Sequence, residues 1–196
     1  MSTAIAILAA GRGSRLGGDA SKPLLEWHGR PLVTWAVNAA LESGLGPVLV
    51  VVGYRSDEVG GVLAGRDVLV VDNPEWEEGI ASSLRAALRV LIPMDDVDAT
   101  CVGLADQPLV GARAYSRLAC ATGDAPIRAA RYDGRPGNPV WLARSLWTEA
   151  MQLRGDTGAR TLMRDGTVDW IDCSDTGSAA DIDTLEDLER LQQEDQ

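Results

Sequence analysis

Short apolar runs alternate along the chain with stretches whose apolar residues recur at helical spacing. Runs of β-type composition cover residues 4–10, 47–52, 68–72, 99–104, 127–132 and 167–171. Two of them are apolar throughout, at 48–52 and 68–71, as parallel strands covered on both faces are. Strands that alternate with helices at this spacing predict βαβ units, and hence a three-layer αβα, Rossmann-like α/β fold with a mostly parallel central sheet.

Two stretches between the runs have the periodicity of amphipathic helices. Their apolar positions are Leu32, Trp35, Ala39 and Ala40 in the first, and Ile80, Leu84, Ala87, Leu88 and Leu91 in the second. Pro31 can begin the first helix and Gly44 can end it. Residues 133–139 form the longest turn-rich stretch, which we interpret as an excursion from the sheet. Because no linker or repeat divides the chain, we expect a single domain over residues 1–196.

The net charge of −11 over 196 residues disfavours a broad nucleic-acid surface. Residues 165–196 hold eleven carboxylates and one arginine, whereas residues 1–30 carry a local charge of +2. Lys22 is the only lysine beside seventeen arginines. No apolar run approaches the roughly 20 residues of a membrane helix, and residues 4–10 lack the basic flank of a signal peptide. We therefore expect a cytoplasmic protein without a membrane partner.

The cysteines and the single histidine offer little chemistry. Cys101, Cys120 and Cys173 are far apart and show no CxxC spacing, which argues against a disulfide framework and a zinc site. We expect Cys101 and Cys120 to be core thiols because they lie in apolar stretches. His28 stands in a turn-like segment, and the chain has no GxSxG nucleophile motif.

A glycine-rich loop follows the first apolar run. Residues 8–18 contain four glycines together with Arg12 and Arg15, and Lys22 follows shortly after. Glycine lets backbone N–H groups approach an anion, and the cations neutralise phosphate charge. The loop is neither a GxGxxG motif, because Leu16 stands at the third glycine position, nor a Walker motif. It predicts a phosphate cradle, with a solvated strand–helix loop as the alternative.

The sequence LAAGRGSRLGG, followed by KPL and then GRPL at 29–32, resembles the MobA-like nucleotidyltransferases, and most of all the molybdenum cofactor cytidylyltransferases. The resemblance continues, in family order, at residues 51–55, 73–85, 104–109, 134–139, 155–160 and 181–188. It implies transfer of CMP from CTP to the phosphate of the molybdenum (molybdopterin) cofactor, with release of pyrophosphate. A molybdoenzyme would then receive the product.

The resemblance also implies roles for individual residues. Nucleotide contacts would come from the glycine loop, at Leu8, Ala9, Ala10, Gly11, Arg12 and Gly13. Arg15 and Lys22 would bind phosphate oxygens and act with Asp106 as the catalytic residues. Asp106 would be a ligand of Mg²⁺, although it can also cap the turn before Pro108. Asp183 would be the second metal ligand, with Asp181 as the alternative, and Thr184 can cap the closing helix with Asp187.

The base and the acceptor are less strongly indicated. In the family, LAAG goes with cytidylyl and LAGG with guanylyl transfer, so Ala10 points to CTP. Ser82 and Ser83 can bind base or ribose or merely cap a helix, and Asp72 and Asn73 share this ambiguity. Asn138 and Arg160 are the candidate acceptor-binding residues. Gln107 replaces a methionine common in the family, which we expect to matter little.

Three tryptophans, at 141, 147 and 170, can stack on a pterin or fill the core. Two alternatives to the leading function are transfer to another small phosphorylated acceptor and a non-catalytic nucleotide- or cofactor-binding role. An NAD(P)-dependent oxidoreductase is disfavoured by Leu16.

Overall fold

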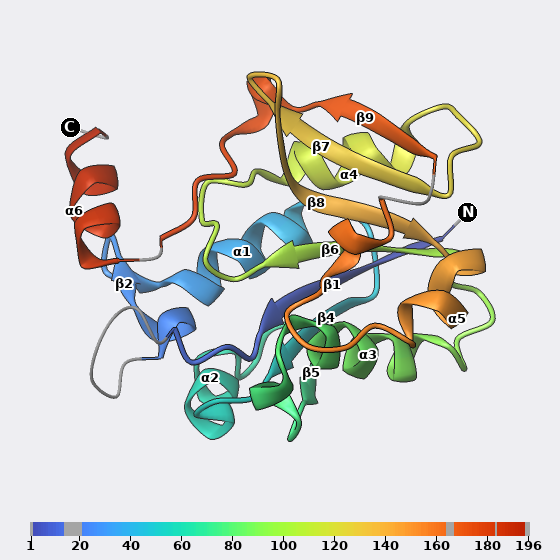
Figure 1. The fold of residues 1–196 in the computed structure, drawn as a ribbon. Helices are drawn as coiled ribbons and strands as arrows, with labels where there is room; N and C mark the ends of the chain where they lie inside the picture. The colour runs from blue at the N-terminus through green and yellow to red at the C-terminus, as the bar shows by residue number, and fades with distance from the viewer. Residues whose placement is uncertain (1, 14–20, 164–166, 183, 195–196) are drawn as a thin grey trace.

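The computed structural model describes residues 2–13, 21–163, 167–182 and 184–194. Its centre is a seven-stranded sheet in the order β5-β4-β1-β6-β8-β7-β9 (Figure 1). The strands are β1 (Thr3–Ala9), β4 (Val48–Val52), β5 (Leu69–Asp72), β6 (Ala99–Leu104), β7 (Ile127–Tyr132), β8 (Arg135–Ala143) and β9 (Val168–Asp172). Every neighbouring pair is parallel except the two that involve β8. The predicted mostly parallel sheet is confirmed.

Helices cover both faces of the sheet and complete the three layers (Figure 1). On one face α1 (Leu32–Glu42), α2 (Ser56–Val62) and α4 (Ala112–Cys120) pack over β1, β4 and β6. On the other face lie α3 (Ile80–Leu91) and α5 (Trp147–Ala150). Short 3₁₀ turns occur at η2 (Lys22–Leu24), η3 (Trp76–Glu78), η4 (Arg144–Leu146), η5 (Ala159–Thr161) and η6 (Ser174–Thr176). No helix in the described ranges is long and apolar enough to cross a membrane.

The two predicted helices form where the periodicity places them, as α1 and α3. Pro31 precedes the first residue of α1, and Gly44 follows its end at φ 71°, a conformation that glycine adopts without strain. Both helices turn their apolar faces to the sheet, where buried leucines, valines and alanines form two clusters, one on each face. The helical periodicity therefore predicts correctly which faces of these two helices are buried.

The interpretation of residues 133–139 as an excursion from the sheet is wrong, because most of them belong to a strand. Only Asp133 and Gly134 make a turn, both at positive φ, and the chain then enters β8 between β6 and β7. β8 pairs antiparallel with β6 at Val140–Ala143, and its register with β7 shifts between Pro136 and Val140. This irregularity accommodates the prolines, which cannot donate to a regular ladder, inside a central strand.

The closing helix α6 (Leu185–Glu194) packs on a small hairpin, β2 (Glu26–Trp27) and β3 (Arg30–Pro31). Leu191 and Ile182 join Trp27 and Leu32 in a third apolar cluster. His28 makes the turn of the hairpin at φ 47°, as its sequence context predicts. The helix is thus bound to the body of the protein by its apolar side.

Individual core predictions have mixed outcomes. Cys101 is buried as expected, but Cys120, the last residue of α4, is exposed, although Leu118 in the same turn is fully buried. Trp141 and Trp147 are core residues, whereas Trp170 on the edge strand β9 remains 38% exposed beside Arg131. The tryptophans 141 and 147 are therefore not available for stacking on a pterin.

Candidate functional site

Parallel strands β1, β4, β5 and β6 all end at the same edge of the sheet, where open α/β sheets bind ligands. A cavity of about 580 Å³ opens there. Its lining residues are Leu8, Ala9, Ala10, Gly11, Arg12, Gly13, Lys22, Pro23, Trp76, Glu77, Gly79, Ile80, Ser83, Leu104, Ala105, Asp106 and Asp156. The structure therefore brings the described part of the glycine loop together with Lys22 and Asp106.

An ion pair between Lys22 and Asp106 lies in this cavity. Lys22 begins η2, Asp106 follows β6, and the Nζ–Oδ2 distance is 2.5 Å. The side chains are 12% and 23% exposed, so the pair is partly shielded from solvent. The two loops are also joined by the backbone, since the Ala105 N–H donates to the carbonyl of Leu8 at 3.1 Å. Opposite charges 84 residues apart are thus fixed at one point.

The other carboxylate oxygen of Asp106 suits a metal ion. Oδ1 is buried and accepts no hydrogen bond from the described residues, and hard oxygen donors are the ligands that Mg²⁺ and similar cations take. No group of three His, Cys, Asp or Glu side chains suited to a metal occurs within the described ranges. Asp183, the expected second ligand, lies outside the described residues. The described part of the chain thus supplies one ligand that fits.

Arg12 stands at the mouth of the cavity against an aromatic pair. Its guanidinium lies 5.3 Å from the ring centroid of Tyr54, whose ring is 5.3 Å from that of Trp76. The Tyr54 N–H donates to the Ala10 carbonyl, which fixes the pair to the glycine loop. Gly53 permits this packing, because a Cβ there would lie 2.6 Å from Cβ of Trp76. Arg15 lies outside the described residues.

The polar residues after β5 serve the interior rather than the cavity. Asn73 Nδ2 donates to Ser82 Oγ at 2.8 Å and to Ser83 Oγ at 3.2 Å. Ser82 Oγ donates in turn to the Gly79 carbonyl at 2.8 Å, a bond back to the N-cap residue within the first turn of α3; no side chain in the described part of the protein caps the N–H groups of this helix start. Asn73 and Ser82 are buried, and neither they nor Asp72 line the cavity, whereas Ser83 does. Ser82 therefore neither caps α3 nor lines the cavity, and its hydroxyl is held in the interior by Asn73 and the Gly79 carbonyl.

A second cavity, of about 350 Å³, adjoins the first and shares the residues Leu8, Ile80, Leu104 and Asp156 with it. Its remaining walls are mainly apolar, and its further polar side chains include Asn138, Thr161 and Asp181. Asn138, one of the two expected acceptor-binding residues, thus lines the second cavity. The backbone of Arg160 lies in η5 between two lining residues, while its side chain is outside the described part.

Arg85 ties together two loops that line both cavities. Its side chain, 4% exposed, donates to Glu78 and to the carbonyl of Leu153 at 2.7 Å. The Gly155 N–H donates to Glu78 Oε1 at 3.3 Å, and the Ala81 N–H donates to the Gly155 carbonyl. The hydrogen bond with Glu78 raises the pKa of Arg85, and it lowers the pKa of the Glu78 carboxyl. The loop at 153–156 is therefore held against the start of α3.

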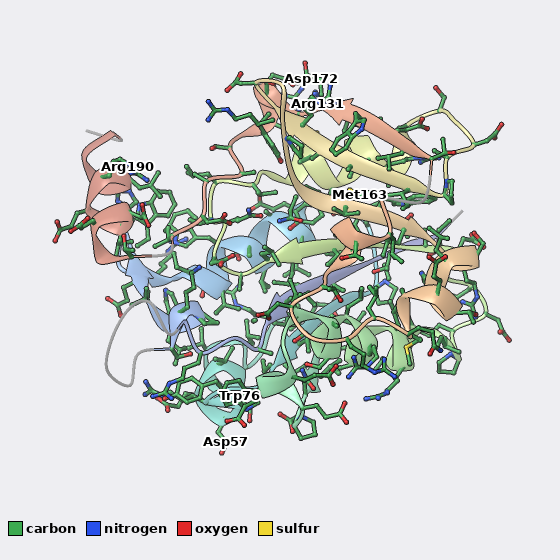
Figure 2. The ribbon with its side chains drawn as sticks, in the orientation of Figure 1. Asp57, Trp76, Arg131, Met163, Asp172 and Arg190 are labelled. Carbon is green, nitrogen blue, oxygen red and sulfur yellow. The ribbon has the colours of Figure 1, made fainter. Side chains whose placement is uncertain are left out.

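Trp76 lines the first cavity. In Figure 2 it lies in the lower part of the molecule, whereas Arg131 of β7 and Asp172 of β9 lie at the top. Sequence reasoning missed Trp76, Glu77, Gly79 and Asp156 as lining residues, because none of these residue types by itself indicates a phosphate site. They lie within the segments of resemblance at 73–85 and 155–160, which was the available signal.

Gln107 is the other residue that sequence reasoning undervalued. It is 2% exposed, and its side-chain amide connects Asn138, Asp181 and the backbone of Ala179. Thr184, by contrast, caps α6 reciprocally with Asp187 as predicted: the Asp187 N–H donates to Thr184 Oγ1, and the Thr184 N–H donates to the Asp187 carboxylate.

Comparison with known proteins gives a consistent family. The sequence model of the MobA-like NTP transferase domain matches residues 5–170. A relative from Paenarthrobacter nicotinovorans, named nicotine blue oxidoreductase, is 32% identical over 94% of this chain and 94% of its own. The crystal structure of Rv0371c from Mycobacterium tuberculosis H37Rv has a TM-score of 0.82 at 28% identity, covering 98% of this chain and 97% of that one. A structure of Rv0371C in complex with manganese has a TM-score of 0.81 at 25% identity, covering 98% and 99%.

Proposed function

The chain belongs to the MobA-like NTP transferase family, and from this premise we propose that it transfers CMP from CTP to the terminal phosphate of the molybdenum cofactor. The observation that carries the proposal is the Lys22–Asp106 pair beside the glycine loop at the carboxyl ends of β1 and β6. At this edge of the sheet, the cation Lys22, the carboxylate of Asp106 and the described part of the glycine loop line one cavity.

The reaction needs electrostatics more than a nucleophilic side chain. An acceptor phosphate oxygen attacks the α-phosphorus of CTP, a new P–O bond forms, and the bond to the β-phosphate oxygen breaks to release pyrophosphate. Lys22 and Arg12 bind phosphate oxygens and oppose the charge that builds up on them. Backbone groups from Leu8 to Gly13 hold the nucleotide in line, and Arg15 is proposed to act with them.

We propose that Asp106 also holds a divalent metal ion, with Asp183 as its second carboxylate and Asp181 as the alternative. The buried Oδ1 of Asp106 supports this role, as does the manganese complex of the M. tuberculosis relative. Magnesium is the proposed ion, and when bound it supplies positive charge next to the triphosphate. Lys22 then has phosphate oxygens as alternative partners to Asp106.

Preference for CTP is proposed from Ala10. Its methyl group lies at the wall of the cavity and packs toward Gly53, since a Cβ on Gly53 would be 2.9 Å from Cβ of Ala10. The methyl group limits the room beside the base, which favours the smaller pyrimidine. The three free cysteines fit a reducing compartment, so the cytoplasm is the proposed location and a molybdoenzyme the proposed recipient.

The experiment is a pyrophosphate-release assay with CTP, GTP, ATP and UTP in turn, each with molybdopterin and Mg²⁺ or Mn²⁺. Release with CTP and molybdopterin is expected, and the Asp106→Asn variant should abolish it. If pyrophosphate is released only with another phosphorylated acceptor, that acceptor would take the place of molybdopterin in the proposal. Tight CTP binding without release with any acceptor would instead favour a non-catalytic binding protein.

A second candidate function follows from the relative named an oxidoreductase, which matches this chain over 94% of both lengths. Its test is oxidation of NADH or NADPH by the purified protein with a redox dye as electron acceptor. Lack of nicotinamide oxidation would eliminate this candidate, whereas turnover that survives Asp106→Asn would separate it from nucleotidyl transfer.

A further inference from the structure

Gln107 is a buried residue, and its side-chain partners Asn138 and Asp181 line the second cavity. Its side chain follows Asp106 in sequence but faces the second cavity's wall rather than the ion pair. Asn138 Nδ2 donates to Gln107 Oε1 at 3.0 Å, and Gln107 Nε2 donates to Asp181 Oδ1 at 2.7 Å and to the Ala179 carbonyl at 3.1 Å. Both N–H groups of the amide and its oxygen therefore have partners.

This arrangement fixes two residues of the second cavity at once. The Gln107 oxygen accepts from Asn138, which sets which end of the Asn138 amide faces Gln107. The Gln107 amide nitrogen donates to Asp181 and fixes the position of one of its carboxylate oxygens. Asn138 is 8% exposed on β8, and Asp181 lies on the segment before α6. Gln107 therefore links two distant parts of the chain across the cavity.

The polar lining of the second cavity is rich in hydrogen-bond acceptors. Asp156 and Asp181 contribute carboxylates, and both are lining residues together with the amide of Asn138. Carboxylates repel an anionic group and receive N–H and O–H groups. The apolar remainder, including Leu84, Val102 and Val140, suits a flat uncharged ring. The phosphate of an acceptor would then point toward Lys22 and Arg12 in the first cavity.

We propose that Gln107 is a specificity-determining positioning residue, which holds Asn138 and Asp181 in the orientation that receives the N–H and O–H donors of the acceptor's ring. The inference rests on the proposed function, because it assigns the second cavity to the acceptor of that reaction. A methionine at this position fills similar space but can neither donate to Asp181 nor accept a strong hydrogen bond from Asn138. Chains with methionine there would orient these two side chains differently.

The test compares Gln107→Met with Gln152→Met, a matched change at an exposed glutamine outside both cavities. The probe is 6-hydroxymethylpterin, an uncharged, donor-bearing ring whose fluorescence reports binding to the protein without turnover. Gln107→Met should weaken probe binding about tenfold or more, equivalent to at least about 1.4 kcal/mol. CTP binding should be unchanged, and Gln152→Met should match the wild type for both ligands.

Asp181→Asn provides a second variant, because a substitution at this exposed residue leaves the core intact. It should weaken binding of the probe in the same direction when the probe is measured without CTP and without divalent metal. Equal loss of CTP and probe binding in Gln107→Met would show a purely structural role and overturn the inference. Probe binding that is undetectable in the wild type, or unchanged in Gln107→Met, would overturn it as well. Absence of pyrophosphate release by the wild type, with the pattern of probe binding as expected, would instead overturn the proposed reaction alone.

Discussion

Replacing Lys22 with methionine separates the chemistry of the site from its stability. Methionine keeps most of the length of the side chain and removes the charge that lies 2.5 Å from Asp106. At an effective dielectric constant of about 20, a partly shielded pair at this distance has a Coulomb energy of roughly 7 kcal/mol, and desolvation and solvent screening offset most of it. We therefore expect a loss of only about 1–2 kcal/mol in the free energy of unfolding.

The effect on catalysis should be much larger. A preorganised group that stabilises charge in a transition state commonly contributes about 10²–10³-fold to the rate constant. Lys22→Met should thus lower kcat of pyrophosphate release by about two to three orders of magnitude, while the folded fraction at room temperature remains close to one.

Three measurements test this expectation together: pyrophosphate release, CTP binding and the urea midpoint of unfolding. Arg113→Met is the control, since that cation is 70% exposed and lies outside both cavities. Because Lys22 is the only lysine, an amine-reactive reagent can modify only this side chain and the N-terminal amine, and CTP should protect Lys22 from it. Wild-type turnover by Lys22→Met, or labelling of Lys22 that is insensitive to saturating CTP, would refute the assignment.

Two further predictions concern the surroundings of the site. Arg85→Lys keeps the charge, but an ammonium group cannot reproduce the planar fork that reaches both Glu78 and the Leu153 carbonyl. KM should rise for both substrates and the melting temperature should fall; unchanged KM values would show that the loops do not depend on this clamp. At the far surface, Arg117 lowers the pKa of Asp175 to about 2. The ion pair of Asp175 with Arg117 therefore stabilises the fold above the unfolded pKa near 4, and this contribution is lost as the pH falls toward 2. Asp175→Asn should thus flatten the acid side of the plot of unfolding free energy against pH. A plot identical to that of the wild type would contradict this.

The sheet and its two long helices could be predicted because their patterns are local. Val48–Val52 is apolar at every position, and a five-residue run of this kind has few alternatives to a covered parallel strand. The strand β8 was missed, because Pro136, Gly137 and Pro139 give the sequence of a turn. Its pairing with β6 is distant in sequence and invisible to a local pattern, whereas the Asp133–Gly134 turn that joins it to β7 is a local hairpin signal that the sequence did offer.

The candidate site shows the same division. The cations and glycines indicated a phosphate-binding loop, and the resemblance indicated Asp106 as a site residue. The structure brings the described part of that loop and Asp106 into one cavity. Asn73 and Ser82 stayed ambiguous, because a polar residue at the end of a strand or the start of a helix has the same sequence signature whether it faces a ligand or closes a hydrogen bond in the interior; here both hydrogen-bond in the interior. Gln107 could be recognised only once the structure showed which distant groups surround its amide.

Several carboxylates of the acidic C-terminal region hold that region to the rest of the protein. Eleven carboxylates in residues 165–196 would repel one another as a solvated tail, yet several have defined partners: Asp175 pairs with Arg117, Asp181 accepts from Gln107, and Asp187 caps α6. Ile182 is fully buried, and its N–H donates to the Asp106 carbonyl at 3.0 Å. The segment that leads into α6 is therefore anchored directly beside the residue proposed to bind the metal ion. For this reason the second carboxylate ligand is best sought in this segment, rather than among the acidic residues of the cavity's opposite wall.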